Sequence, residues 1–176
     1  MIFCESWLKG ACLITLEPAV DERGSFTRTF CRSEFEKKSL VIDYVQHSIS
    51  ENSLKGTLRG MHYQLEPVAE TKLVQCLRGA VYDVIVDLRP QSPTFCGWES
   101  FELTADNYQL LYVPEGFAHG FVTLTDDTTL YYMISAQYSP ELARGIRYDD
   151  PLFGIKWPDI DLIIARKDRL WPDFKR

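Results

Sequence analysis

The sequence predicts an all-β fold, either a sandwich or a barrel, with a few short helices at its edges. Between Gly10 and Gln137 the chain divides into short segments that alternate in polarity or are rich in β-branched residues. Turn residues, chiefly glycine, proline, aspartate and asparagine, separate these segments. Aromatic residues make up 13% of the chain, which suits a β-protein or a site that stacks planar ligands. The length predicts one domain over residues 1–176, because a chain of this size buries a full core without disulfides.

The pattern predicts ten strands in chain order, at residues 10–17, 25–30, 44–50, 56–64, 71–77, 79–89, 95–103, 108–113, 120–124 and 128–137. The first ends at Pro18 and a turn over 21–24. The second places Phe26, Arg28 and Phe30 on one side. The strand at 79–89 is the most strongly β-branched, and two prolines follow it closely. Pairs of Asp or Asn residues mark the turns before the strands that begin at 108 and 128.

The remaining segments are predicted to be helical or irregular. Residues 32–39 are rich in charge and form the first helix candidate, with Ser33 as its cap. From Pro140 onward the chain contains Asp-Asp-Pro and Trp-Pro and shows no long periodic pattern. We expect this tail to cover the β-core as an irregular segment with a short helix.

Charge and composition exclude several classes of protein. The formal net charge is −6 and the chain has no run of Lys or Arg, which argues against a nucleic-acid partner. No apolar stretch approaches membrane-spanning length, and the start Met-Ile-Phe-Cys-Glu lacks the basic segment of a signal peptide, so we expect no membrane partner. The five cysteines are odd in number and lack CxxC spacing, which predicts reduced thiols and a cytoplasmic location. In such an acidic chain, an anionic ligand needs a local cluster of cations.

The run Gly-Thr-Leu-Arg-Gly-Met-His-Tyr-Gln at 56–64 concentrates polar chemistry among small and apolar residues. With the period of two of a strand, Arg59 falls on one face, whereas His62 and Gln64 project from the other. Gly60 leaves room beside the imidazole for a ligand or another backbone. A lone histidine in a strand is more often structural than catalytic, so the interpretation of His62 depends on its neighbours.

Four other residues extend this candidate site. Lys72, on the next strand, can point into the same cavity as His62. His119 lies in Pro-Glu-Gly-Phe-Ala-His-Gly, where proline and glycine predict a loop with space for a substrate, although an ordinary turn fits as well. Tyr132 and its neighbour in Leu-Tyr-Tyr-Met point to opposite faces, so one phenol points inward, most often as a core residue. Asp168 is a carboxylate that can orient an imidazole, although most such aspartates are solvated.

A metal site is the main competitor for a β-barrel that contains histidines. Such a site needs several His and carboxylate ligands from neighbouring strands. The chain has three histidines, His47, His62 and His119, and no His-x-His pair. We therefore predict no metal. A cysteine nucleophile is disfavoured as well, because no cysteine lies in any of these motifs.

A series of motifs, in order, resembles the dTDP-4-dehydrorhamnose 3,5-epimerase family of nucleotide-sugar enzymes over residues 10–173. They are Gly-Thr-Leu-Arg-Gly-Met-His-Tyr-Gln, Lys-Leu-Val, Val-Tyr-Asp-Val-Ile-Val-Asp-Leu-Arg, Ser-Pro-Thr-Phe, Pro-Glu-Gly-Phe-Ala-His-Gly-Phe, Gly-Ile-Arg-Tyr-Asp-Asp-Pro and Ile-Lys-Trp-Pro. The resemblance implies a cupin-like jelly-roll β-barrel that works without cofactor or metal, usually as a homodimer. It also implies a role in deoxysugar synthesis for cell-surface polysaccharides, such as O-antigen and lipopolysaccharide, or for glycosylated metabolites.

The resemblance also implies a role for each site residue. The family inverts carbons next to the ketone of a nucleoside-diphospho-4-keto-6-deoxy sugar. His62 matches its base, Asp168 the acid that orients the base, Tyr132 the proton donor and Lys72 the cation near the developing oxyanion. The positions that match its substrate contacts are Arg23, Phe26, Gln46, Arg59, His119 and Tyr138, the last of which stacks on the nucleotide base.

Three positions depart from the family pattern. Arg28 and Ala143 stand where glutamate is common, and Ser48 where asparagine is common. In the family all three belong to nucleotide or substrate contacts, so the proton-transfer residues match while the nucleotide base stays open between thymidine, our first choice, and cytidine. Three alternatives to a 3,5-epimerase also stay open: a 3-epimerase, a ketoisomerase and an inactive sugar-nucleotide-binding barrel.

Overall fold

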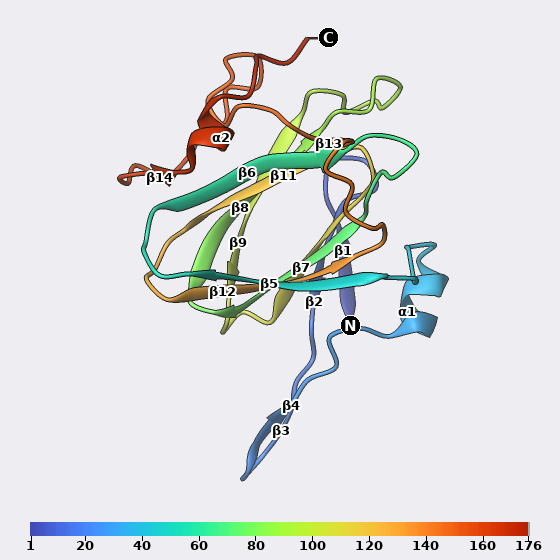
Figure 1. The fold of residues 1–176 in the computed structure, drawn as a ribbon. Coiled ribbons are helices and arrows are strands. Elements are labelled where there is room, and N and C mark those ends of the chain that lie inside the picture. Colours follow the sequence, from blue (N-terminus) through green and yellow to red (C-terminus); the bar gives the residue numbers. More distant parts are fainter. Residues whose placement is uncertain (176) are drawn as a thin grey trace.

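Two antiparallel sheets packed face to face form the body of the molecule in a computed structural model that describes residues 1–175 (Figure 1). The first sheet has the order β1 (Ile2–Glu5), β2 (Cys12–Thr15), β10 (Gln109–Val113), β7 (Lys72–Arg78), β12 (Thr128–Ile134) and β5 (Gln46–Asn52). The second has the order β13 (Ala143–Gly145), β6 (Thr57–Gln64), β11 (Phe117–Thr123), β8 (Ala80–Asp87) and β9 (Trp98–Thr104), with β14 (Ile163–Ile164) parallel to β6. A separate hairpin pairs β3 (Ala19–Asp21) with β4 (Gly24–Phe26).

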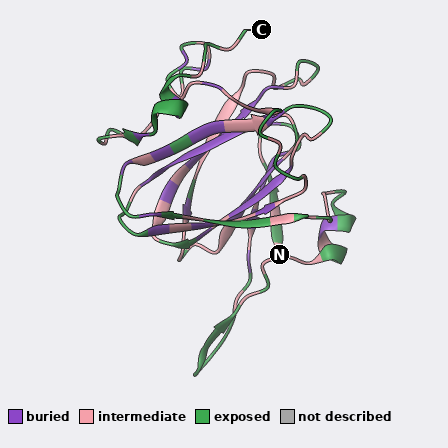
Figure 2. Ribbon diagram, in the orientation of Figure 1, coloured by how far each residue is buried: buried purple, intermediate pink, exposed green. Residues whose placement is uncertain are grey.

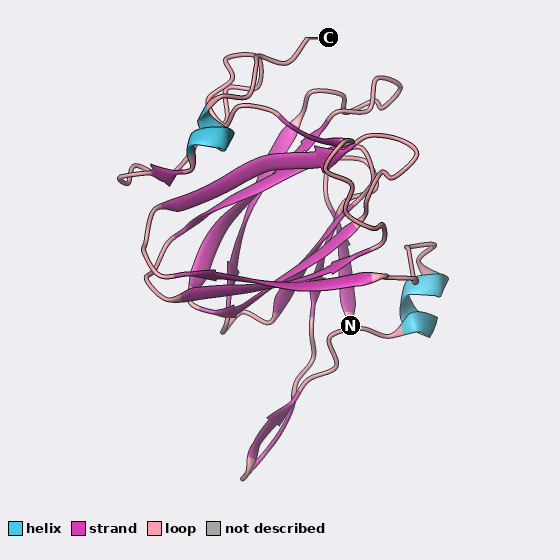
Figure 3. Cartoon of the chain, in the orientation of Figure 1, coloured by secondary structure: helices cyan, strands magenta, loops and turns pink. Residues whose placement is uncertain are grey.

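The order of strands β5 to β12 is that of a jelly roll. These eight strands pair as β5-β12-β7-β10 in one sheet and β6-β11-β8-β9 in the other, so the chain crosses between the sheets at nearly every connection. Strands dominate the molecule, and its helices are short and lie at the edges (Figure 3). The structure thus confirms the prediction of an all-β, cupin-like jelly roll.

The central strands are buried on both faces (Figure 2). Val81 and Ile85 of β8 belong to the apolar core between the sheets, together with Phe117 and Phe121 of β11. Val84, next to Ile85 on β8, packs instead in a second cluster under the C-terminal tail. Burial on both faces explains why β8 is a nearly continuous β-branched run.

Two predicted N-terminal elements differ from the structure. The first helix, α1, spans Arg32–Lys37, and its cap is Cys31, so the prediction of Ser33 as cap was wrong. The strand expected over 25–30 ends at Phe26, because the next segment turns to place Phe30 on Phe35 of α1, with ring centroids 4.8 Å apart.

The C-terminal tail covers the outer face of the second sheet, as predicted. Ile146 and Phe153 pack against Val84 and its neighbours, while Ile164 of β14 packs against Leu58 of β6. A short helix, α2 (Arg166–Arg169), follows β14. No helix in the described part of the chain is long and apolar enough to cross a membrane.

Candidate active site

A cavity of about 580 Å³ lies between the two sheets, beside β5 and β6. Strands β5 and β12 form one wall, β6 and β11 form the opposite wall, and the segment at 163–168 closes one side. The polar and charged residues that line it are Ser48, Ser50, Thr57, Arg59, His62, Lys72, His119, Tyr132, Lys167 and Asp168. All four residues that match the family's chemical roles therefore lie on one cavity.

His62 and Asp168 form a hydrogen-bonded dyad although 106 positions separate them. Nε2 of His62 lies 2.8 Å from Oδ1 of Asp168. Asp168 reaches β6 because β14, just before α2, pairs with the first residues of that strand. The side chain of His62 is 38% exposed, whereas that of Asp168 is 2% exposed, so the imidazole faces the cavity and the carboxylate lies behind it.

The electrostatics of the dyad favour a charged carboxylate. Burial raises the pKa of Asp168, but the hydrogen bond and charge of His62 and the Gly60 N–H outweigh it and hold the pKa below its ordinary value. At neutral pH, Asp168 therefore accepts the hydrogen on Nε2 of His62, which leaves Nδ1 of that imidazole free to take a proton.

Arg59 lies on the same side of the sheet as His62, so the prediction that they face opposite ways was wrong. His119 of β11 pairs with His62, and Phe121 of β11 pairs with Arg59. An advance of two residues along β11 therefore corresponds to three residues along β6. This β-bulge breaks the alternation and turns Arg59 into the cavity. Gly60 lies in the bulge with φ +142°, where a Cβ would lie 2.6 Å from the Cα of Gly120.

Lys72 points into this cavity, as predicted. Its ammonium donates a hydrogen bond of 3.1 Å to the carbonyl of His62 and lies 2.9 Å from Oε1 of Glu70. The lysine side chain is 9% exposed and that of Glu70 is 11% exposed. Lys72 is thereby held beside the imidazole as a fixed positive charge.

His119 lies in strand β11 and not in a loop, so the predicted loop was wrong. The glycine that precedes it by three residues ends the turn, and the strand begins at Phe117. His119 is 5% exposed and still lines the cavity. Its Nε2 lies 2.9 Å from both carboxylate oxygens of Asp83, a residue of β8 that is fully buried.

Tyr132 reaches the cavity from β12, on the wall opposite His62. Its ring meets that of His119 edge to face, with centroids 5.9 Å apart. Burial first, and then the charge of Asp83, raise the pKa of Tyr132 well above its ordinary value, although Arg59 lowers it. The phenol is therefore protonated at neutral pH.

The other predicted contact residues lie outside the cavity. Gln46 and Tyr138 are joined at its end, where the Tyr138 N–H donates a 2.6 Å hydrogen bond to the side chain of Gln46. Arg23 and Phe26 are exposed on the β3–β4 hairpin, which projects away from the barrel (Figure 1). Within one chain, these two residues do not approach His62.

Sequence reasoning missed four residues of the site. Asn52 accepts a hydrogen bond from Arg59, Glu70 pairs with Lys72, and Asp83 pairs with His119. The fourth, Lys167, lines the cavity. Asp83 had a usable signal, because a carboxylate inside a β-branched strand needs a buried partner. Glu70 had no comparable signal. Among residues 1–175, no three His, Cys, Asp or Glu side chains form a group that could hold a metal ion.

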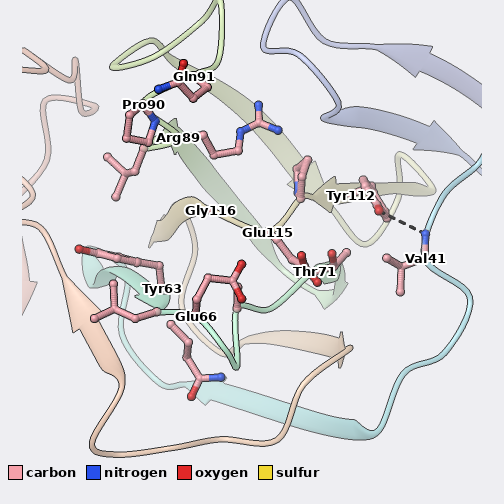
Figure 4. A pocket seen from close by; sticks show the side chains of 15 residues that line it. Val41, Tyr63, Glu66, Thr71, Arg89, Pro90, Gln91, Tyr112, Glu115 and Gly116 are labelled. Carbon is pink, nitrogen blue, oxygen red and sulfur yellow. Dashed lines mark hydrogen bonds between the residues drawn. The ribbon is translucent and has the colours of Figure 1, made fainter.

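A second cavity, of about 670 Å³, is lined largely by apolar residues such as Leu88, Pro90 and Tyr112. Figure 4 shows two carboxylates, Glu66 and Glu115, near its centre. Burial raises the pKa of Glu115, and the charge of Glu66 adds to this effect. None of the described residues that line it carries a role implied by the resemblance.

Comparisons with known proteins identify the family of this chain. A family model described as dTDP-4-dehydrorhamnose 3,5-epimerase matches residues 5–176. A dTDP-4-dehydrorhamnose 3,5-epimerase from Sinorhizobium fredii is 46% identical over 86% of this chain and 78% of its own. The crystal structure of a dTDP-4-dehydrorhamnose 3,5-epimerase from Bacillus anthracis, with TDP and PPi bound, is 39% identical with a TM-score of 0.95, over 98% of this chain and 99% of its own. A 3'-monoepimerase from Streptomyces bikiniensis, in complex with dTDP-quinovose, is 33% identical with a TM-score of 0.90, over 96% and 86% of the two chains.

Proposed function

This chain belongs to the dTDP-4-dehydrorhamnose 3,5-epimerase family, and we propose that it inverts C3 and C5 of dTDP-4-dehydro-6-deoxyglucose to give dTDP-4-dehydrorhamnose. The observation that carries this proposal is that a His–Asp dyad and a tyrosine face each other from opposite walls of the same cavity. It is an isomerase reaction in which the reacting groups are side chains of the protein.

Inversion next to a ketone requires a base on one face of the sugar ring, an acid on the other, and a positive group for the enolate oxygen. His62 is the base, because Asp168 holds its Nε2–H and leaves Nδ1 unprotonated. Tyr132 is the acid, since it is protonated and reaches the cavity from the other sheet. Lys72, fixed between Glu70 and the His62 carbonyl, stabilises the enolate oxygen.

The cations of this cavity suit a nucleoside diphosphate in an otherwise acidic protein. Arg59, Lys72 and Lys167 line it although the chain has a net charge of −6. Tyr138 is 64% exposed and bonds Gln46, which pairs with the cavity residue Ile134, so a nucleotide base can stack on its ring beside the cavity. The bound TDP of the Bacillus anthracis relative and the dTDP-quinovose of the Streptomyces bikiniensis relative favour thymidine as that base.

A competition between nucleotides tests the substrate. With dTDP- and CDP-4-keto-6-deoxyglucose supplied in parallel, we expect a higher kcat/KM for the dTDP sugar. The measurement is an NMR time course that also identifies the product, so that inversion at C3 alone or a carbonyl moved to C3 is recognised. Faster turnover of the CDP sugar would overturn the assignment of thymidine as the nucleotide base. Ser48, at the cavity wall, departs from the family pattern and leaves the nucleotide base open.

The β3–β4 hairpin supports a homodimer. Arg23 and Phe26 match nucleotide contacts, yet in one chain they lie on a projecting hairpin, 82% and 77% exposed respectively. A large exposed apolar residue beside a cation is typical of a binding surface. We infer that the hairpin of one subunit completes the nucleotide site of its partner.

Mixing two defective variants tests this arrangement. H62A lacks the base and R23A lacks the hairpin cation, so each alone is expected to turn over poorly. A mixed dimer has one site with both residues, and we expect the mixture, after subunit exchange, to exceed the summed activity of its parts. A monomer in sedimentation velocity, or a mixture without restored activity, would contradict the shared site.

The family membership and the free thiols support a cellular role. All five cysteines are free in the described structure, in keeping with a reducing compartment. We propose that the protein acts in the cytoplasm, in dTDP-rhamnose synthesis for O-antigen, lipopolysaccharide or related deoxysugar products.

A further inference from the structure

Asp83 is a buried carboxylate in the apolar core, and the proton transfers described above do not use it. It lies on β8 between Val81 and Ile85, which belong to the core between the sheets, and it is fully buried. Its partner is His119 on the neighbouring strand β11, whose Nε2 lies 2.9 Å from both carboxylate oxygens. The pair therefore lies between the core and the cavity that His119 lines.

Burial of this pair disfavours a net charge. An aspartate with a neutral imidazole would carry one negative charge into the core, whereas the same pair with one more proton is neutral overall. The additional proton is bound either to the Asp83 carboxylate or to Nε2 of His119. In both cases the second ring nitrogen, Nδ1, carries a hydrogen, because an imidazole that receives a hydrogen bond at Nε2 must be protonated at Nδ1.

The neighbouring charges leave this balance in place. The titratable and charged groups near the pair are His62, Arg59, Lys72, Cys76 and Tyr132, and the adjacent strand β9 carries Glu99 opposite Ile85. Lys72 favours a charged Asp83, but Glu70 already pairs with that lysine at 2.9 Å. Burial raises the pKa of Asp83, and His119 and Lys72 only partly oppose this effect. Full burial and the close His119 partner therefore favour the neutral form of the pair.

Nδ1 of His119 opens onto the cavity. Among residues 1–175 it has no protein hydrogen-bond partner. It is also not one of the enclosed polar atoms that lack a partner in that part of the chain, which are the hydroxyl of Tyr44, Oε1 of Gln75 and Nε1 of Trp171. The atom is thus accessible, and the cavity is the space that His119 borders.

We propose that Asp83 and His119 share one proton, and that this sharing holds a hydrogen on Nδ1 of His119 as a donor to the substrate. Asp83 is a positioning residue in this account, since it acts through His119. The inference rests on the proposed epimerase function: the donor is directed to a substrate oxygen that gains charge when His62 removes the proton next to the ketone. Tyr132, whose ring lies beside that of His119, is kept protonated chiefly by its own burial.

The proton position is measured without substrate. The chain has three histidines, so a long-range 1H–15N spectrum of protein labelled at histidine shows three imidazoles, and H47Q and H62Q assign His119 by elimination. At pH 7 we expect Nδ1 of His119 to carry a hydrogen. A bare Nδ1 with a hydrogen only on Nε2 would overturn the proposal.

The second test is the pH dependence of kcat in the variant D83N. Because both carboxylate oxygens lie 2.9 Å from Nε2, an asparagine amide nitrogen in either orientation can donate to Nε2 and keep the hydrogen on Nδ1. In the native pair, rising pH removes one proton: the hydrogen leaves Nδ1, the shared proton stays on Nε2 facing the charged Asp83 carboxylate, and kcat falls because the donor is lost. D83N has no such proton to lose, so we expect the alkaline limb of its pH profile to move to higher pH while the acid limb stays in place.

Asp87 supplies the matched control on the same strand. It is also fully buried, but it binds Arg89, Ser92 and Thr94 away from the cavity. We expect D87N to keep both limbs of the native profile, whatever it does to the melting temperature. An unchanged alkaline limb in D83N would contradict the shared proton. If the native protein turns over no nucleotide sugar, the proposed function fails, and the NMR arm alone decides the proton position.

Discussion

The variant H62A is expected to lose turnover of the nucleotide sugar while its fold survives. General base catalysis contributes about 10²- to 10⁴-fold to the rate of a proton transfer, and in the proposed mechanism the same base acts at both carbons. The loss follows from the geometry, because Nδ1 of His62 is the ring nitrogen that Asp168 leaves free. Product formation followed by NMR, at several enzyme concentrations, measures it.

The fold of H62A is expected to persist because the His62 side chain is half-exposed at the cavity. Removing it leaves the Asp168 carboxylate without its partner, which costs about 1–3 kcal/mol for a buried group, and at the low end here because cavity water can reach it. H47A is the matched control: His47 lies on β5 and bonds the hydroxyl of Tyr131 outside the cavity. A folded H62A with native turnover would sink the assignment of the base.

The variant Y132F is expected to separate proton removal from inversion. Phenylalanine keeps the ring against His119 but removes the only atom of this side chain that can deliver a proton. His62 can still form the enolate and return a proton to the same face, so exchange with solvent continues. We therefore expect inverted product to fall by about 10²- to 10⁴-fold while deuterium still enters C3 of the recovered substrate.

Tyr131 provides the control for this experiment. It is the adjacent residue of β12, but it packs in the cluster on the opposite side of the first sheet and bonds His47. Y131F is expected to keep native product formation. If Y132F formed inverted product at the native rate, another group would have to be the donor.

Local signals in the sequence allowed an all-β sandwich or barrel and part of the site to be predicted, whereas the jelly roll was implied only by the family resemblance. Short strands are marked by alternation and by turn residues, and both signals lie within a few positions of each other. The same is true of His62 and Lys72, which lie on consecutive strands of the chain. Asp168 could be assigned only through the family resemblance, since its approach to β6 depends on the pairing of β14.

The features that sequence reasoning missed depend on contacts between distant segments. The face of Arg59 depends on how β6 registers against β11, and the bulge at Gly60 shifts that register by one residue. His119 was assigned to a loop because glycine and proline precede it, whereas tertiary pairing with β6 and β8 extends the strand. The partner of His119, Asp83, lies 36 positions away and only the fold brings the two together.

Deuterium incorporation from D2O tests the central claim most directly. The native protein is incubated with dTDP-4-keto-6-deoxyglucose in D2O, and the product is examined by NMR at each carbon. Proton removal and return on both sides of the ketone predicts deuterium at C3 and at C5, with both centres inverted. Deuterium at C3 alone would reduce the protein to a 3-epimerase, and no deuterium at either carbon would contradict the account of the cavity as an epimerase site.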